Sequence, residues 1–549
     1  MKINETSTVS KAVSTTQVVG IIVIIVLAAG VGYYFYSTSG TAGTTSTTPA
    51  VTYKDTIVIG TTDSLECACV DPAKDYDYFG GSVLIPNLGA PLVDFVPGTT
   101  DTSPSAIQPA LATKWTVSAD GLAWTFILRS GTKFDDGTPF DSSVVKYSID
   151  RGIRIADPDG AFVGLGYSDI IDSVTTPNAT AVVFHLKSPF APFLSLMTFA
   201  TSFSVNPNRA PANSIVNFTS GDPVKSNPLG LGPYVLSEWT RSGNVEQEMK
   251  LDANPNYWNY PTYPKTPHII IKFYTDATTL AAAVKAGDVD MGYRQFKTAD
   301  IQSLQTTSGV KVWSSAGAFI QYLVINQHVK PLDNPVVRQA IAAAVNRSNL
   351  IKTVFLGTAS PLYSQVPIGM FSHQDVFKTR YGDANYAKTI QLLSQAGYSS
   401  SNKLVVDLWY ESSGHYPQSS DQALVLKNDL EASGVIIVNL HGTDWGTYRA
   451  QRRAGTMALF IMGWYPDFID PFDYTQPFFQ SSGSSWLNNG YNSTQMDSLI
   501  HQAITAASQP QALSLYQQIQ QLSATDVPMV PLYQGGANCC GVVAKTSVS

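Results

Sequence analysis

Short apolar runs alternate with helical stripes along most of the chain. Residues 57–59 read Ile-Val-Ile, a pattern typical of a buried strand. Farther on, Asp120 and Gly121 separate two apolar runs, as the turn of a β-hairpin does. Apolar side chains at helical spacing predict amphipathic helices over 334–346 and 386–396. Together these patterns predict a mixed α/β protein with more than one lobe.

One apolar stretch near the N-terminus has the length of a membrane span. Residues 18–36 are an unbroken run of Val, Ile, Leu, Ala, Gly, Tyr and Phe, and about 20 such residues span the hydrocarbon layer of a bilayer. We expect a cytoplasmic n-region at 1–17, a single-pass anchor at 18–36, and a flexible Ser/Thr-rich tether at 37–51. A cleaved secretion signal, or a pilin-type signal that stays attached, is the alternative. Each alternative places the body outside the cell.

Composition narrows the function classes. The chain has 549 residues, enough for two or three domains, and only 14% of them are charged. The net charge of -7 comes without a basic patch, which argues against nucleic-acid binding. Polar residues that do not titrate therefore make up much of the predicted surface.

Four cysteines occur as two close pairs, and neither pair has the spacing of a common zinc or redox site. In an exported chain we expect disulfides, and we predict bridges that join the N-terminal pair to the C-terminal pair. Free buried thiols are the alternative. The four residues are Cys67, Cys69, Cys539 and Cys540.

The chain lacks the sequence motifs of the common catalytic and cofactor sites. It contains no phosphate-binding loop, no nucleophile elbow and no H-E-x-x-H pattern among its seven histidines. Asp467, Asp470 and Asp473 form an acidic cluster without the spacing of a calcium loop. We therefore predict a protein that is not an enzyme and that needs no cofactor and no metal.

Seven motifs, in order along the chain, carry a family resemblance. Residues 107–151 read IQPALATKWTVSADGLAWTFILRSGTKFDDGTPFDSSVVKYSIDR, and this block resembles the signature of the family-5 extracellular solute-binding proteins of ABC importers, the oligopeptide/dipeptide-binding family. The other six are NPLGLGPYVLSEW at 227–239, NPNYW at 254–258, AGDVD at 286–290, PVVRQAIAAAVNR at 335–347, LLSQAGY at 392–398 and GWYPDFIDP at 463–471. We interpret most of these residues as structural and not as ligand contacts, because they are turn glycines and bulky core aromatics.

The resemblance implies a type II periplasmic-binding-protein fold. Two α/β lobes would be joined by two crossovers and would close like a hinge over a solute, and an extra subdomain would be inserted in lobe I. Family boundaries place lobe I at 52–95, 225–280 and 520–549, the inserted subdomain at 96–224, and lobe II at 281–519. The permease and the ATPase would be separate chains.

Ligand contacts also follow from the resemblance. Asp467 occupies the position at which peptide-binding members pair with the ligand's α-ammonium group, and Trp464 is the accompanying cleft aromatic. The position two before Gly463, where an oligopeptide binder would carry a basic residue, is Ile461. Further tryptophans predicted in lobe II, which would suit stacking on sugar rings, are Trp313, Trp409, Trp445 and Trp486. Oligopeptide is the first predicted solute and oligosaccharide the alternative.

A different class of function is a surface adhesin or envelope protein. Four N-glycosylation sequons suit that class as well as an exported receptor, and they stand at Asn178, Asn217, Asn346 and Asn492. An adhesin would leave the seven motifs without an explanation. A hydrolase is the third possibility, and no nucleophile or metal motif supports it.

Overall fold

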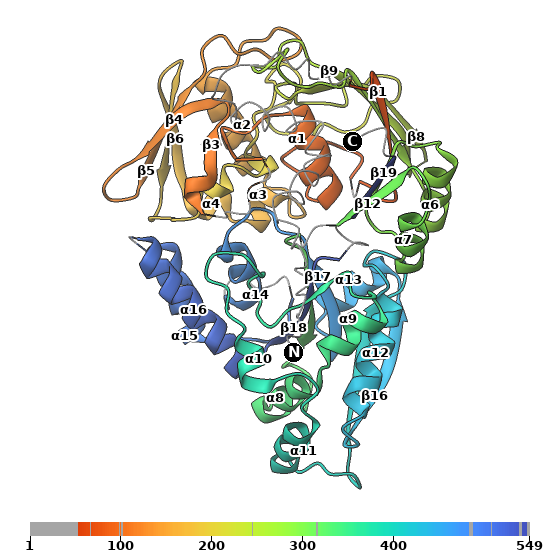
Figure 1. The fold of residues 1–549 in the computed structure, drawn as a ribbon. Helices are drawn as coiled ribbons and strands as arrows, with labels where there is room; N and C mark the ends of the chain where they lie inside the picture. The colour runs from red at the N-terminus through yellow and green to blue at the C-terminus, as the bar shows by residue number, and fades with distance from the viewer. Residues whose placement is uncertain are drawn as a thin grey trace, which may run out of the picture.

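The computed structural model describes residues 53–65, 67–97, 99, 103–243, 245–314, 317–481, 487–506, 508–536 and 541–545. Two large sheets organise these residues, one in the upper and one in the lower half of Figure 1. The predicted anchor at 18–36 and tether at 37–51 lie outside the described residues. Within the described part, no helix combines the length and the apolar character that crossing a bilayer requires.

Lobe I is built on a seven-stranded mixed sheet. Its strand order is β12-β19-β11-β1-β10-β9-β8, with β1 parallel to both β10 and β11. The strands are β1 (Thr56–Thr61), β8 (Tyr234–Ser242), β9 (Val245–Ala253), β10 (His268–Phe273), β11 (Met291–Tyr293), β12 (Val310–Ser314) and β19 (Gly541–Lys545). The run at 57–59 is thus part of a central strand, as its apolar pattern predicts.

A separate four-stranded antiparallel sheet lies within residues 112–186. Its order is β4-β5-β7-β6, with β4 (Ala112–Val117), β5 (Ala123–Leu128), β6 (Ile171–Asn178) and β7 (Ala181–Leu186). The predicted hairpin joins β4 to β5, and Gly121 in its turn has a φ of 72°, which glycine adopts without a steric penalty. A two-stranded ribbon of β2 (Val93–Phe95) and β3 (Ile107–Pro109) accompanies this sheet.

Lobe II is built on a six-stranded sheet with the order β14-β18-β13-β17-β15-β16. Its strands are β13 (Ile320–Ile325), β14 (Ser360–Pro361), β15 (Leu404–Glu411), β16 (Ile436–Thr443), β17 (Leu459–Trp464) and β18 (Met529–Gln534). Every residue of β13, β17 and β18 is buried, so the centre of this sheet is also the centre of the lobe's core.

Helices cover the sheets of both lobes. Around the lobe I sheets lie η3 (Gly80–Leu84), α1 (Ile85–Leu88), η4 (Pro104–Ala106), α2 (Ser142–Ile155), α3 (Ala161–Gly164), α4 (Tyr167–Ile170), α5 (Phe193–Leu196), η5 (Ala200–Ser202), α6 (Ala277–Ala286) and α7 (Thr298–Gln305). Lobe II carries α8 (Pro335–Ala344), α9 (Arg347–Thr353), α10 (Val376–Tyr381), α11 (Tyr386–Gln395), α12 (Ser419–Glu431), α13 (Trp445–Arg453), η6 (Pro471–Tyr474), α14 (Gln476–Phe479), α15 (Thr494–Ile504) and α16 (Gln509–Asp526). The two helices predicted from apolar spacing are α8 and α11.

Among the described residues, the chain crosses between the two large sheets twice. It leaves the lobe I sheet after β12, enters lobe II at β13, and returns after β18 to form β19. Sheet membership therefore corrects two predicted boundaries. Strands β11 and β12 belong to the lobe I sheet and not to a lobe II that begins at 281, and β18 belongs to the lobe II sheet although it lies beyond residue 519. Sequence order alone does not predict that β11 belongs to lobe I, because β11 joins that sheet by pairing with β1, which lies more than 200 residues earlier in the chain.

The described cysteines correct the predicted disulfide pattern. Cys67 bonds to Cys69, its neighbour two residues away, with 5.2 Å between the Cα atoms, and so does not bridge to the C-terminal pair. This Cα separation lies within the range that a disulfide spans. Cys539 and Cys540 lie outside the described residues.

The four sequons differ in their surroundings. Asn178, Asn217 and Asn492 are exposed, as glycan acceptors must be. Asn346 is half-buried, and its side chain accepts a hydrogen bond from the Asn349 backbone N–H as the cap of α9. Glycosylation at all four stays a prediction.

Candidate solute-binding site

Side chains from both lobes meet around the segment that follows β17. This segment, 465–470, continues the GWYPDFIDP motif and carries Tyr465 and Asp467. From lobe I, the Tyr76 hydroxyl donates a hydrogen bond of 2.6 Å to Asp467 Oδ2. A second interlobe bond of 2.5 Å runs from Arg294 Nη1 to the Tyr465 hydroxyl. The segment after β17 is therefore one place where the two lobes contact through polar groups.

Three carboxyl groups gather on the lobe II side of this contact. Asp473 is 1% exposed, and its Oδ2 accepts hydrogen bonds from Trp464 Nε1 (3.1 Å) and from the Asp467 backbone N–H (3.0 Å). Asp470 accepts from the Phe472 backbone N–H at 2.8 Å. Among the described residues, no basic side chain forms an ion pair with Asp467, Asp470 or Asp473.

Burial changes the acidity of this carboxyl cluster. Loss of solvation raises the pKa of Asp467, and the hydrogen bond from Tyr76 offsets part of that rise. Burial raises the pKa of Asp473 well above its ordinary value, and the negative charge of Asp467 raises it further. Burial also raises the pKa of Asp470 to about 6. A cationic solute group placed beside these carboxyls would favour their ionised forms.

The lobe I side of the contact carries a buried arginine. Arg294 forms a two-pronged ion pair with Asp63 through its Nε (2.7 Å) and Nη2 atoms. Its guanidinium lies 4.4 Å from the ring centre of Tyr78 and 4.6 Å from that of Tyr465. The backbone of Arg294 has a φ of 39°, in the left-handed region, where a non-glycine residue is strained. Strain of this kind is concentrated at functional positions.

Next to this arginine stands a neutral imidazole. The His415 ring stacks on Trp445 with 3.7 Å between the ring centres. Burial, together with the nearby positive charges of Arg294 and Arg449, lowers the pKa of His415 to about 3. The interlobe contact is thus acidic around Asp467 and positively charged around Arg294.

The structure brings together only some of the predicted site residues. Asp467 and Trp464 lie in the site, and Trp464 orients Asp473 through its indole N–H. Trp445 joins the site through its stacking on His415. Trp409 lies on β15, where its ring stacks on His441 at 4.5 Å. Both of these tryptophans therefore present a face that is already covered by a histidine.

The remaining two tryptophans do not join the described site. Trp313 is 9% exposed and lies in β12 of the lobe I sheet, where Lys311 covers its ring at 5.0 Å. Its prediction as a lobe II cleft residue is wrong, because β12 pairs with β19 before the chain crosses to lobe II. Trp486 lies outside the described residues.

Sequence reasoning missed Tyr76, Arg294 and Tyr465. Tyr76 and Arg294 come from segments that are distant in sequence from the GWYPDFIDP motif, and the sequence gives no periodic signal for either. Asp473 carried a usable signal, because its spacing from Asp467 and Asp470 marks an acidic cluster. Ile461 is buried in β17, and a basic side chain that contacts the same segment is Arg294, through its bond to the Tyr465 hydroxyl.

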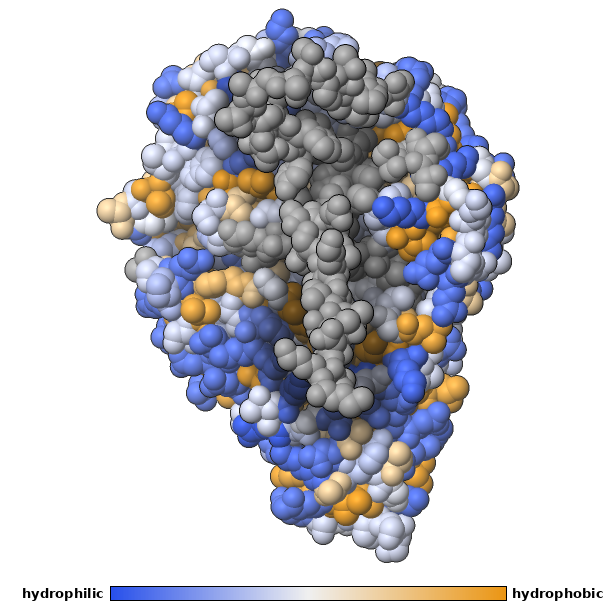
Figure 2. Space-filling model, in the orientation of Figure 1, coloured by the Kyte–Doolittle hydropathy of each residue, from blue (hydrophilic) through white to orange (hydrophobic). Residues whose placement is uncertain are grey.

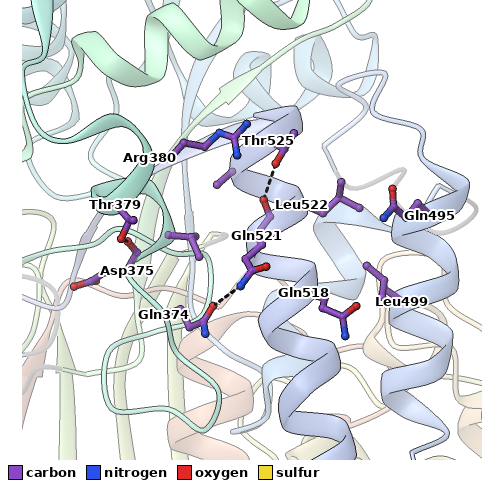
Figure 3. A pocket seen from close by; sticks show the side chains of 12 residues that line it. Gln374, Asp375, Thr379, Arg380, Gln495, Leu499, Gln518, Gln521, Leu522 and Thr525 are labelled. Carbon is purple, nitrogen blue, oxygen red and sulfur yellow. Dashed lines mark hydrogen bonds between the residues drawn. The ribbon is translucent and has the colours of Figure 1, made fainter. Parts of the chain in front are cut away.

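A surface groove of about 820 Å³ lies away from this contact, between α10, α15 and α16. Its walls carry mainly amide and hydroxyl side chains, among them Gln374, Gln518 and Gln521 (Figure 3). Figure 2 shows that the flank of lobe II on which α15 and α16 lie is mostly hydrophilic. The groove shares none of its lining residues with the interlobe site.

Two lobes, two chain crossings and a polar contact between the lobes define a hinged binding protein. The family model for bacterial extracellular solute-binding proteins, family 5 Middle, matches residues 106–486, so the chain belongs to that family.

Individual relatives agree with this assignment. The chain is 28% identical over 462 residues to "Heme-binding protein A" of Haemophilus influenzae, covering 80% of each chain. It is 28% identical over 464 residues to "Di/tripeptide-binding protein 2" of Pseudomonas aeruginosa, covering 80% of this chain and 82% of that one. Among solved structures, the periplasmic binding protein DppA from Helicobacter pylori, in complex with the peptide STSA, matches with a TM-score of 0.72 and 24% identity over 89% of this chain and 94% of that chain. The solved structure supports the periplasmic-binding-protein fold.

Proposed function

We propose that this chain is the solute-binding component of an ABC importer, and that it captures oligopeptides outside the cell and delivers them to a separate permease. The observation that carries the proposal is the half-buried carboxyl of Asp467, which lies at the contact between the lobes without a cationic partner among the described residues. A peptide α-ammonium supplies the missing charge, and a buried charge is stable only when it is paired.

Arg294 supplies the opposite end of the recognition. A guanidinium has five N–H donors, and the contacts to Asp63 and Tyr465 use three of them. We infer that the two others bond a carbonyl or carboxylate of the solute when it is bound. Acidic and basic groups at one interlobe contact suit a short peptide, which carries both charges. The named relatives include a di/tripeptide-binding protein, and this supports the same class of solute.

Oligosaccharide is the weaker alternative. Sugar rings stack on uncovered aromatic faces, and the rings of Trp409 and Trp445 each have one of their two faces stacked on a histidine, which leaves less aromatic surface for a sugar. Asp467 would contribute only an ordinary hydrogen bond to a sugar. The covered faces therefore favour peptide.

Titration calorimetry on the full-length protein tests the proposal. A defined library of di- to tetrapeptides should give binding heat, whereas the N-acetylated form of the tightest binder should bind far more weakly. Asp467→Asn should weaken peptide binding roughly thirtyfold or more, since truncating one partner of a buried charge pair costs about 2–5 kcal/mol. Trp409→Ala is the matched control and should change affinity little.

The outcome for an oligosaccharide receptor would be the reverse. Cello- or malto-oligosaccharides would then give heat, and a tryptophan substitution would matter more than Asp467→Asn. Heat with neither class of ligand, from protein shown to be folded, would contradict the proposal and favour the adhesin hypothesis.

We also propose that residues 18–36 anchor the body to the outer face of the cell membrane. The apolar run and the family's extracellular role support this arrangement. Carbonate extraction of host membranes should leave the protein in the membrane fraction. Release of a shortened chain into the medium would instead indicate a cleaved signal.

A further inference from the structure

Asp473 lies behind Asp467 and is closed off from solvent. Its Oδ2 accepts two hydrogen bonds, from Trp464 Nε1 and from the Asp467 backbone N–H. Its Oδ1 is buried and has no hydrogen-bond partner among the described residues. An ionised oxygen in that position would be unsolvated and unpaired, which is energetically costly. The geometry therefore favours a protonated, neutral Asp473.

The titratable groups that face this pair come from several elements, and none among the residues that the structure describes is cationic. Tyr76 approaches Asp467 from the lobe I segment before η3, and Tyr167 approaches from α4. Asp470 adds a like charge from the same lobe II segment, and Tyr516 of α16 contacts Asp470 in turn. Two carboxyls in such surroundings cannot both ionise easily, because each negative charge opposes the other, Asp473 is buried and Asp467 is only partly exposed to solvent.

We propose that capture of a cationic solute group at Asp467 expels the proton that this carboxyl carries in the empty protein, while Asp473 stays protonated as a neutral positioning residue. This inference rests on the proposed function. The exchange balances simply: the neutral carboxyl releases one proton to solvent, and the carboxylate that remains pairs with the solute's ammonium. No bond other than this O–H bond is broken.

The pKa directions agree with the geometry. Burial raises the pKa values of both Asp467 and Asp473, and the hydrogen bond from Tyr76 lowers that of Asp467 in part. At pH values below the raised pKa of Asp467, binding must remove one proton, so affinity should fall about tenfold for each pH unit of acidification. At higher pH the carboxyl is already ionised, and affinity should level off.

Calorimetry measures the released proton directly. The full-length protein is titrated with the tightest member of the di- to tetrapeptide library at about pH 5.5, where the peptide ammonium is fully charged, and at about pH 7.5, where the proton uptake by the partly neutral free peptide is subtracted. Each titration is repeated in two buffers of different ionisation enthalpy, and the difference in heat counts the protons. We expect close to one proton released per peptide at the lower pH and a smaller number at the higher pH.

Four variants distinguish the role of Tyr76 from that of Asp473. Tyr76→Phe removes the donor that stabilises the Asp467 anion, so proton release should persist to higher pH. Asp473→Asn keeps a neutral group with an acceptor oxygen and should leave the proton count unchanged, whereas Asp473→Leu removes that acceptor and should weaken binding. Asp429→Asn is the matched control, because Asp429 is also buried, has an oxygen without a partner, and lies outside the site.

The outcomes distinguish this inference from the proposed function. Peptide binding with no proton release at either pH would overturn the inference and leave the proposed function intact. Loss of proton release in Asp473→Asn would overturn the neutral role of Asp473. Absence of binding by every peptide would overturn the proposed function and this inference with it.

Discussion

Tyr76 and Asp467 connect the two lobes through a single hydrogen bond. The phenol belongs to the lobe I segment before η3, and the carboxyl belongs to the lobe II segment after β17. The bond length of 2.6 Å lies within the ordinary range of O–H···O hydrogen bonds. Such a contact exists only while the lobes are closed. Its strength therefore contributes to the balance between open and closed forms.

Tyr76→Phe should shift the empty protein toward the open form. The variant loses one hydrogen bond of about 1 kcal/mol, so the ratio of closed to open molecules should fall roughly fivefold. Small-angle scattering of the full-length protein without solute should report a larger radius of gyration. Tyr167→Phe is the control, because the Tyr167 hydroxyl bonds Ser202 within lobe I. An unchanged radius for Tyr76→Phe would show that this bond does not hold the lobes together.

Arg294→Met should destabilise the fold strongly. The substitution leaves Asp63, which is 8% exposed, as a buried carboxylate without its charge partner, and breaking a buried pair in this way costs about 3–5 kcal/mol. Denaturant unfolding should show a lower midpoint, and the double variant Asp63→Asn/Arg294→Met should recover much of the loss. The exposed pair of Lys250 and Glu238 provides the control, since Lys250→Met should have little effect. If Arg294→Met and Lys250→Met lowered the free energy of unfolding equally, the role assigned to burial would be contradicted.

Local pattern was enough to predict several elements. The apolar stripe of α8 and the hairpin at Gly121 depend on neighbours within a few residues, so sequence spacing records them. The GWYPDFIDP motif also singled out Asp467, which bonds Tyr76 of lobe I, and Trp464, which bonds Asp473; the contact of both with a solute stays a prediction. Features that depend on one short segment were therefore accessible without coordinates.

Relations between distant segments were not accessible. Arg294 pairs with Asp63 across 231 residues, and no periodicity links the two positions. The same limit hid the strand pairing that keeps β12, and with it Trp313, in lobe I. The cysteines show a different limit, because two close pairs allow several connectivities and spacing alone does not select one.

Asp429 should make the protein less stable as pH rises through a defined window. Burial raises the pKa of Asp429 from its ordinary value of 3.8 to about 6. Between those values the unfolded chain has lost the proton and the folded chain still holds it, so the free energy of unfolding falls as pH increases, and it levels off above about pH 6. Asp429→Asn should remove this slope and stabilise the protein at neutral pH by roughly 2 kcal/mol.

Denaturant unfolding at about pH 4 and about pH 7 measures this effect of Asp429. The control is Asp421→Asn, on the exposed face of the same helix α12, which should behave like the parent protein. If Asp429→Asn leaves the free energy of unfolding at neutral pH equal to that of the parent protein, the assigned direction of the Asp429 pKa shift is wrong.

Gly463→Ala should weaken solute binding through steric displacement. A Cβ atom at this position in β17 would lie 2.7 Å from the Phe319 ring and 2.8 Å from the Tyr416 ring, closer than real side chains approach. Phe319 packs on Tyr465 with 4.3 Å between ring centres, so its displacement would move the phenol that accepts from Arg294. Overpacking of this kind costs about 1–3 kcal/mol of stability.

Calorimetric titration with the tightest peptide and thermal unfolding should be measured together on Gly463→Ala. We expect affinity to fall several-fold, and Phe319→Leu in the same chain to restore part of it by making room for the added methyl group. Gly81→Ala is the matched control, since a Cβ there would lie 3.8 Å from Phe199, an ordinary contact distance. Full peptide affinity in Gly463→Ala would show that the position of Tyr465 does not depend on the packing of Phe319, and the glycine of the GWYPDFIDP motif would then serve only the strand.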